Sequence, residues 1–167
     1  YNKICKLSEE EKAKGIITAS AGNHAQGVAF SANDLGIDAT ICMPEQTPMI
    51  KVDGTLKYGA KVDLFGENFD ACKDHALERA EKEGLTFIPP FDDLDVIEGQ
   101  GTISLEILED LEYVDYVIVP VGGGGLIAGV AKCIKQISPL IKVIGVEPVS
   151  AASMKEAVKE GLSLIHI

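Results

Sequence analysis

The sequence is short of basic residues, and those it has are scattered along the chain. It carries 15 Lys and Arg against 26 Asp and Glu, a formal net charge of −11. Nucleic-acid surfaces are strongly basic, so this balance excludes a nucleic acid as partner. The sequence also lacks an apolar run long enough to cross a bilayer, and residues 1–6 lack the apolar core of a signal peptide. We therefore expect no membrane partner and a cytoplasmic protein.

Clustered cysteines are missing as well. The four cysteines are far apart and form no C-x-x-C pair, which argues against a metal site or a disulfide framework. Reduced and mostly buried thiols are expected instead. They are Cys5, Cys42, Cys72 and Cys133.

What the sequence does contain is a regular alternation of short apolar strands and longer helices. With 46% hydrophobic residues it can form one sizeable core or two small ones. Continuous apolar strands that alternate with helices predict an α/β fold with parallel sheets covered on both faces. The expected strands are 16–19, 39–43, 61–65, 86–88, 114–121 and 141–146. The first expected helix begins after Ser8 and ends at Gly15. The other expected helices are 23–35, 48–58, 68–83, 96–111, 125–137 and 151–160.

Two consecutive prolines, Pro89 and Pro90, mark a boundary in this alternation. Proline bars regular structure, and three βα units precede the break while two follow it. We therefore predict two sheets and two lobes. Ligands of open α/β sheets bind outside the carboxyl ends of the strands, so a site between the lobes is expected.

A run of four glycines, Gly122 to Gly125, separates an apolar strand from an apolar helix. A helix start offers unpaired N–H groups and the positive end of the helix dipole, both of which favour an anion. One or two glycines would suit a tight turn, but four in succession remove every side chain. We interpret this loop as a phosphate site.

The same loop has a second, weaker interpretation as part of a dinucleotide-binding βαβ unit. In that case Glu147, at the end of the next strand, would bind a ribose. The third glycine of that fingerprint is missing, because its position holds Ile127 and glycine returns only at Gly129. A nucleotide-binding oxidoreductase half remains an alternative.

Residues 20–27 read Ser-Ala-Gly-Asn-His-Ala-Gln-Gly at another turn from strand to helix. Taken singly, Ser20 and Asn23 suit ordinary helix caps, and His24 suits a packed side chain. The whole string, however, resembles the substrate-carboxylate loop of pyridoxal-phosphate enzymes of the tryptophan-synthase-β fold. The likeness is to the branch of serine/threonine dehydratases and serine racemases, and the glycine run with Leu126 resembles that family's cofactor-phosphate loop.

The resemblance extends over residues 1–160 and is closest to the threonine dehydratases. Sulfhydrylases and threonine synthases of this fold usually have Gly-Asn-Thr where this chain has Gly22-Asn23-His24. Further segments look like the same branch in the same order. They are Tyr1-Asn2-Lys3, Met43-Pro44, Tyr58-Gly59-Ala60, Gly99-Gln100-Gly101-Thr102 and residues 143–148.

The resemblance implies a fold type II enzyme with pyridoxal 5'-phosphate as cofactor, an amino acid (threonine or serine) as substrate, and a homo-oligomeric parent. Threonine would be deaminated by β-elimination to 2-oxobutanoate and ammonia, and serine to pyruvate. Asn23 would hold the ring hydroxyl of the cofactor, and Ser20, Asn23 and His24 would orient the substrate carboxylate. The cofactor phosphate would be held by Gly122, Gly123, Gly124, Gly125 and Leu126.

The resemblance also implies an internal piece of a longer protein. The family's Schiff-base lysine lies upstream of Tyr1, so the fragment itself is expected to be inactive. Residues 1–14 and 93–161 would belong to the large lobe and 15–92 to the small lobe. Residues 162–167 depart from the family's continuation and are expected to be a non-native tail.

Two positions bear on which member of the branch the chain resembles. Racemase-like members bind a divalent cation through a glutamate that matches Glu147 and an aspartate six residues later, where this chain has Ser153. No metal is therefore expected. Ala21 stands where racemases have the serine that reprotonates the α-carbon, which favours elimination. The alternatives are a serine racemase-like or other hydroxy-amino-acid ammonia-lyase and a non-catalytic cofactor-binding module.

Overall fold

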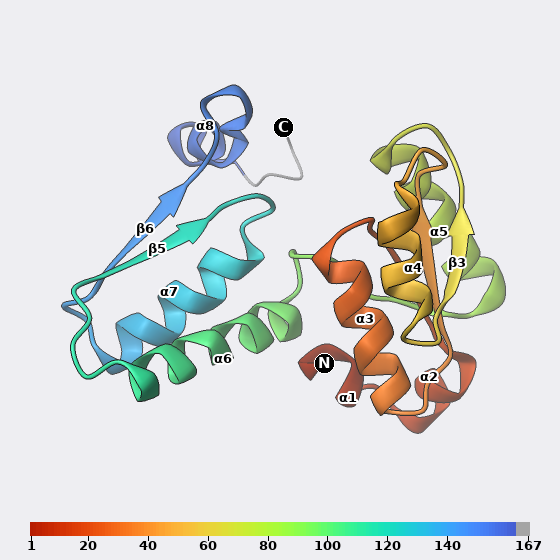
Figure 1. Cartoon of the computed structure of the whole chain (residues 1–167), viewed down its shortest axis with the longest axis horizontal. Helices are drawn as coiled ribbons and strands as arrows, with labels where there is room; N and C mark the ends of the chain where they lie inside the picture. The colour runs from red at the N-terminus through yellow and green to blue at the C-terminus, as the bar shows by residue number, and fades with distance from the viewer. Residues whose placement is uncertain (163–167) are drawn as a thin grey trace. The chain divides into compact units, whose positions relative to one another are not determined.

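The computed structural model describes residues 1–162 and divides the chain into two compact units (Figure 1). They are Tyr1–Pro90 and Phe91–Ile167. The assignment of residues 1–14 to the lobe that carries the glycine run stays a prediction.

The first unit is built on a four-stranded parallel sheet with the strand order β3-β2-β1-β4. The central strand β1 pairs with β2 through Ile16 to Ala39 and Ala19 to Cys42, and all four of its residues are buried. Both of its neighbours run parallel to it, so their carboxyl ends share one edge. The strands are β1 (Ile16–Ala19), β2 (Ala39–Met43), β3 (Lys61–Leu64) and β4 (Thr86–Phe87).

Helices precede and connect these strands. Ser8 forms a capping box, because its hydroxyl accepts from the Glu11 N–H at 3.2 Å while its own N–H donates to the Glu11 carboxylate at 2.7 Å. Gly15 ends that helix with a φ of 93°, which favours glycine. The helices are α1 (Asn2–Cys5), α2 (Glu9–Lys14), α3 (Asn23–Asp34), α4 (Met49–Leu56) and α5 (Phe69–Glu83).

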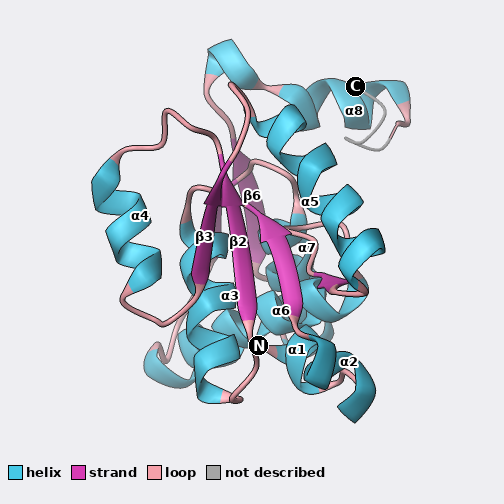
Figure 2. Cartoon of the chain, turned by 90° about the vertical axis from the view of Figure 1, so that its right-hand side faces the viewer, coloured by secondary structure: helices cyan, strands magenta, loops and turns pink. Residues whose placement is uncertain are grey.

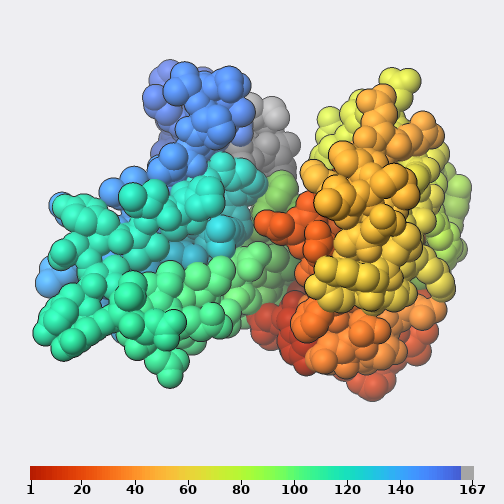
Figure 3. Space-filling model, in the orientation of Figure 1, coloured from red at the N-terminus to blue at the C-terminus, as the bar shows by residue number. Residues whose placement is uncertain are grey.

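Helices cover both faces of this sheet, as the sequence predicts. Figure 2 shows α4 on one side of the strands and α5 on the other. On the first side, Ala25, Val28 and Ala29 of α3 pack with Ile16 and Ile41. On the second side, α5 contributes Cys72 and Ala76 to a cluster with Ile17, Ala19 and Cys42. Helix α4 forms part of the outer surface of the unit (Figure 3).

The second unit has a two-stranded parallel sheet, β5-β6, and the sheet residues that pack with α7 are partly or fully buried. Val119, Val130, Ile134 and Ile141 form its core. The elements are α6 (Leu94–Asp110), β5 (Tyr116–Pro120), α7 (Gly125–Ile137), β6 (Lys142–Val146), a 3-10 turn (Val149–Ala151) and α8 (Ser153–Glu160).

One face of this sheet is uncovered within residues 91–162. Tyr116, Ile118, Ile144 and Val146 are exposed. The reason is that α6 packs mainly on α7. A Cβ at Gly101 would lie 3.1 Å from the Gly129 carbonyl, so the two helix backbones approach closely where both residues are glycine.

Candidate functional site

The turn after β1 places a hydroxyl and a helix start at the carboxyl edge of the first sheet. Ser20 continues the ladder by donating its N–H to the Cys42 carbonyl at 3.0 Å, and its hydroxyl accepts from the Gly22 N–H at 3.2 Å. The N-cap of α3 is Gly22, which offers no side chain, and Asn23 is the first helical residue. Neither Ser20 nor Asn23 is therefore an ordinary cap of α3.

This arrangement leaves the start of α3 able to receive an anion. The first N–H groups of a helix have no partner inside the helix, and here no side chain caps them. The Asn23 side chain is exposed at the same point, and Ser20 is half-buried. A carboxylate fits these donors and the positive end of the helix dipole.

His24 points into the unit rather than outward. Its Nε2 lies 3.1 Å from the hydroxyl of Thr18 and 3.1 Å from the carbonyl of Ile88. Burial lowers the pKa of His24 below its ordinary value, although the bond to the Ile88 carbonyl opposes this effect. At neutral pH the imidazole is therefore uncharged.

Thr18 is a polar residue of this site that the sequence interpretation missed. It is fully buried within β1, and its hydroxyl donates to the Ile88 carbonyl at 2.7 Å. Its only signal in the sequence is a hydroxyl in an otherwise apolar strand, and the partner lies 70 residues away.

The second predicted loop begins helix α7. Gly124 is its N-cap, with a φ of 88°, and no side chain caps the helix. The Ala128 N–H donates to the Gly124 carbonyl at 3.0 Å, which makes it the first bond of the helical pattern. The N–H groups before Ala128, including that of Leu126, are left for another acceptor.

The surroundings of the four glycines in this loop differ in how much space they leave for a side chain. A Cβ at Gly123 would overlap the Phe91 ring, one at Gly124 would overlap Met154, and one at Gly125 would lie 2.8 Å from the Phe91 carbonyl. A Cβ at Gly122 would meet nothing within 4 Å. Packing against Phe91 thus accounts for Gly123 and Gly125, and the φ of 88° accounts for Gly124, so the fold explains more of the glycines than the sequence interpretation allowed. Gly122 is the one that the fold does not require.

A cavity of about 220 Å³ lies against this loop. Gly123, Gly124 and Gly125 line it together with Phe91 and Met154. Bare backbone, an uncapped helix start and adjacent space are what a phosphate group needs, so the residues present fit the phosphate of pyridoxal phosphate.

Glu147 has a structural partner. Its carboxylate accepts from the N–H of Met154 at 2.8 Å and from the N–H of Lys155 at 2.9 Å, and so caps the start of α8. Both carboxylate oxygens are engaged in this cap, which weakens the ribose-binding alternative.

A separate group of potential metal ligands lies between α5 and the strands β2 and β3 of the first sheet. Ligand atoms of Cys42, Asp63 and His75 are all within 4.8 Å of one another. The Asp63 carboxylate, however, accepts from His75 at 2.9 Å and from Arg79 at 2.7 Å. Burial, with a contribution from Asp63, raises the pKa of Cys42 to about 12, so its thiol is protonated. The Arg79 cation already pairs with the Asp63 carboxylate, so we interpret the group as part of an ion-pair network.

Asp63→Asn is expected to lower the free energy of unfolding by about 1 kcal/mol at pH 7. Partial burial raises the pKa of Asp63, but the hydrogen bonds from His75 and Arg79 outweigh it and hold the pKa below its ordinary value. This contribution is present above the unfolded-state pKa and is lost as the pH falls through the folded-state pKa. Urea unfolding at pH 7 and pH 3 measures it. Asp38→Asn is the matched control, because its pair with Lys61 is exposed and is expected to contribute almost nothing.

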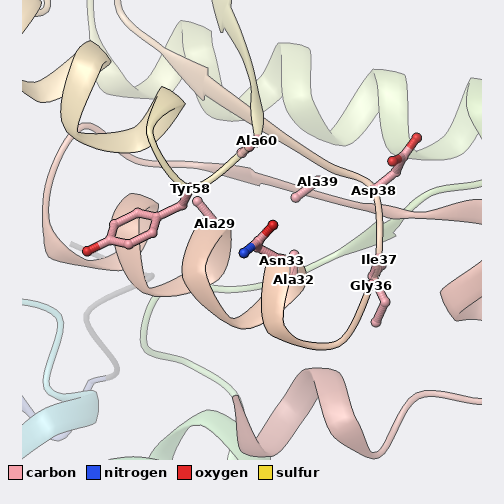
Figure 4. A pocket seen from close by; sticks show the side chains of 10 residues that line it. Ala29, Ala32, Asn33, Gly36, Ile37, Asp38, Ala39, Tyr58 and Ala60 are labelled. Carbon is pink, nitrogen blue, oxygen red and sulfur yellow. The ribbon is translucent and has the colours of Figure 1, made fainter.

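The first unit has another cavity of about 220 Å³ at the opposite edge of its sheet, before β2 and β3. In Figure 4 the Tyr58 ring and the Asp38 carboxylate point away from one another, and the Asn33 amide lies between them among alanine side chains. Asp38 pairs with Lys61 at 3.1 Å. This edge carries the amino ends of the strands, where ligands of such sheets rarely bind.

None of the helices within residues 1–162 is both long enough and apolar enough to cross a membrane. Cys42 and Cys72 are buried, Cys133 is half-buried and Cys5 is exposed, and all four are free thiols.

Comparison with known proteins decides the family. Residues 1–164 match the family described as pyridoxal-phosphate dependent enzyme. The chain belongs to this family. It is 56% identical over 161 residues to the biosynthetic, chloroplastic threonine dehydratase 2 of Solanum lycopersicum, covering 96% of this chain and 27% of that protein. It is 56% identical over 156 residues to the catabolic L-threonine dehydratase of Staphylococcus aureus strain N315, covering 93% of this chain and 45% of that protein.

Solved structures of the family have the same fold. Processed threonine deaminase isoform 2 of Solanum lycopersicum superimposes with a TM-score of 0.93 at 55% identity, over 98% of this chain and 48% of that one. Maize serine racemase gives a TM-score of 0.92 at 36% identity, over 97% of this chain and 49% of that one. The fold type II class is thereby confirmed. The chain spans less than half of the length of each of these relatives.

Proposed function

We propose that this pyridoxal-phosphate dependent chain carries the substrate-carboxylate loop and the cofactor-phosphate loop of a threonine ammonia-lyase. The parent enzyme converts L-threonine to 2-oxobutanoate and ammonia, and L-serine to pyruvate. The observation that carries this proposal is the 56% identity over 161 residues to a threonine dehydratase. The N-termini of α3 and α7, which follow the two predicted loops and have no side-chain cap, also support it.

Each loop has a defined task in this proposal. The N–H groups at the start of α7, from Gly122 to Leu126, hold the cofactor phosphate. The N–H groups at the start of α3 and the Ser20 hydroxyl receive the substrate carboxylate, and the Asn23 amide donates to the ring hydroxyl of the cofactor.

When bound, pyridoxal phosphate supplies an electron sink that lets the α-proton and then the β-hydroxyl of the substrate leave. The chain's own residues orient the substrate. A carboxylate fixed at the start of α3 leaves the amino acid rotation about the Cα–carboxylate and Cα–Cβ bonds, which limits the directions in which the α-proton and the β-hydroxyl can be presented. The half-buried Ala21 next to Ser20 offers only a methyl group and moves no proton.

The proposal is tested by exchanging the matching 161-residue segment of the tomato threonine dehydratase for this chain, which gives a chimaeric enzyme that we call the exchange protein. The tomato protein then supplies every segment that this chain does not span. We expect the exchange protein to bind pyridoxal phosphate and to form 2-oxobutanoate and ammonia from L-threonine. An exchange protein that is folded and loaded with cofactor, yet inactive on both L-threonine and L-serine, would overturn the proposal.

Serine racemisation is the second candidate, since solved serine racemases share the fold at 36% and 37% identity. Ala21 argues against it, because a methyl group can neither donate nor accept the α-proton. We expect the exchange protein to form negligible D-serine from L-serine and Ala21→Ser to allow a small amount. Chiral chromatography of the products measures both. Substantial D-serine from the unsubstituted protein would favour the racemase.

The compartment and the assembly of the parent belong to this proposal too. A cytoplasmic homo-oligomer stays the prediction, although the tomato relative is named chloroplastic.

A further inference from the structure

Three backbone segments of the first unit meet at one buried point. Thr18 comes from β1, His24 from the first turn of α3, and Ile88 directly follows β4. The Thr18 hydroxyl lies 2.7 Å from the Ile88 carbonyl, and Nε2 of His24 lies 3.1 Å from each of these two oxygens. We call these three residues the Thr18 node.

The chemistry of these atoms fixes where the protons lie. A carbonyl oxygen only accepts, so both close neighbours of the Ile88 carbonyl must donate to it. The Thr18 hydroxyl therefore donates to Ile88, and its lone pairs remain free to accept from His24. Nε2 of His24 carries a hydrogen that it shares between the Ile88 carbonyl and the Thr18 oxygen. An unprotonated Nε2 would place its lone pair against the carbonyl oxygen at 3.1 Å.

We propose that Thr18 is a positioning residue of the substrate-carboxylate loop: with the Ile88 carbonyl it holds His24 as the neutral Nε2–H tautomer and so fixes the first turn of α3. The functional part of this inference rests on the proposed ammonia-lyase activity. His24 then acts through its position, because its N–H is used inside the unit. The substrate carboxylate is held by the N–H groups of α3 and by Ser20, with no histidine cation.

The position of the node in the sheet explains why one hydroxyl matters. Ser20 is two residues beyond Thr18 on the same segment, and its N–H is bonded to the Cys42 carbonyl of β2. The hydrogen bonds of the Thr18 node connect the start of α3 to β1 and to the end of β4. The Ser20 hydrogen bond connects the turn between β1 and α3 to β2. Loss of the Thr18 hydroxyl removes the bond between His24 and β1 and leaves the bonds from His24 to Ile88 and from Ser20 to Cys42, so the N–H groups at the start of α3 are held less firmly in one direction.

The tautomer of His24 is measured first, on the 167-residue chain itself. This measurement does not require the chain to have enzymatic activity. Long-range ¹H–¹⁵N NMR spectra separate the two neutral tautomers and the cation, and His24→Gln assigns the signal. At pH 7.5 we expect a single Nε2–H tautomer in the unsubstituted chain and in Thr18→Ser. In Thr18→Val the Ile88 carbonyl is the acceptor that remains for Nε2–H, so we expect shifted His24 signals and a fraction of the Nδ1–H tautomer. A cation or an Nδ1–H tautomer in the unsubstituted chain would overturn the proposal, as would an unchanged His24 signal in Thr18→Val.

The kinetic consequence is measured in the exchange protein. Thr18→Val is expected to raise KM for L-threonine about tenfold, the effect of roughly one hydrogen bond, with kcat changed less than about twofold. Thr18→Ser keeps the hydroxyl and should stay within about threefold of the unsubstituted KM. An equal rise of KM in Thr18→Ser and Thr18→Val would contradict a role for the hydroxyl.

A second pair of variants keeps the test informative if Thr18→Val folds poorly. His24→Gln places an uncharged N–H donor near the position of Nε2, whereas His24→Ala removes it. We expect KM to rise with Ala and to be largely restored with Gln, because the node needs a neutral donor. No restoration with Gln would assign His24 to direct contact with the substrate. Failure of the proposed activity itself would leave the exchange protein inactive while the NMR result stands.

Discussion

Gly122→Asp is expected to lower the affinity of the exchange protein for pyridoxal phosphate by about 100-fold. The substitution adds a carboxylate at the start of α7, where the phosphate is proposed to bind. Repulsion between single charges about 5 Å apart, at an effective dielectric constant of about 20, is about 3 kcal/mol, which corresponds to about 100-fold in affinity. Spectrophotometric titration of the cofactor-free protein measures the change.

Gly122 is a better test position than its neighbours. A Cβ there meets nothing within 4 Å, whereas any side chain at Gly124 is strained by its φ of 88° and by Met154. Gly122→Ala is therefore the matched control and should change the affinity less than about threefold. Pyridoxal without its phosphate provides the second control, because Gly122→Asp should hardly change its binding. An equal loss for pyridoxal would place the phosphate elsewhere.

Gly129→Ala is expected to destabilise the second unit by about 2–3 kcal/mol. Its Cβ would overlap the Ile97 carbonyl and lie 2.8 Å from the Gly101 N–H nitrogen, so α6 and α7 would have to separate. Because α7 also carries the phosphate loop, the affinity for the cofactor should fall as well. Urea unfolding of the 167-residue chain measures the loss of stability.

Gly27→Ala is the matched control for this substitution. Gly27 also lies inside a helix, α3, but a Cβ there meets nothing within 4 Å. Alanine in an open helical position should stabilise the protein by about 0.5–1 kcal/mol. The two substitutions thus make the same chemical change, but their expected effects on the free energy of unfolding are opposite in sign. A loss at Gly27, or no loss at Gly129, would contradict the close helix approach.

The sequence predicts most of the fold because its strands and helices are strongly patterned. Strands β1 and β2 and helix α7 begin and end where expected, since apolar runs and glycines bound them clearly. Helix α1 is missed, because its four residues have no capping side chain. The packing of α6 on α7 is not predicted, since it depends on a tertiary contact between Gly101 and Gly129.

The candidate site is predicted less completely. The two loops stand out in the sequence because their unusual residues are neighbours in the chain. Thr18 and Ile88, by contrast, are 70 residues apart, and nothing local links them. The same holds for Phe91, whose packing explains Gly123 and Gly125. Partners that the fold brings together from distant segments are outside the reach of a local pattern.

The rate at which the exchange protein forms 2-oxobutanoate tests the central claim most directly. It shows whether this chain can replace the matching segment of a threonine dehydratase. With saturating pyridoxal phosphate, we expect kcat/KM for L-threonine within about tenfold of the unexchanged tomato enzyme, a difference of about 1.4 kcal/mol. A folded, cofactor-loaded exchange protein that releases no 2-oxobutanoate from L-threonine would contradict the assignment of both loops.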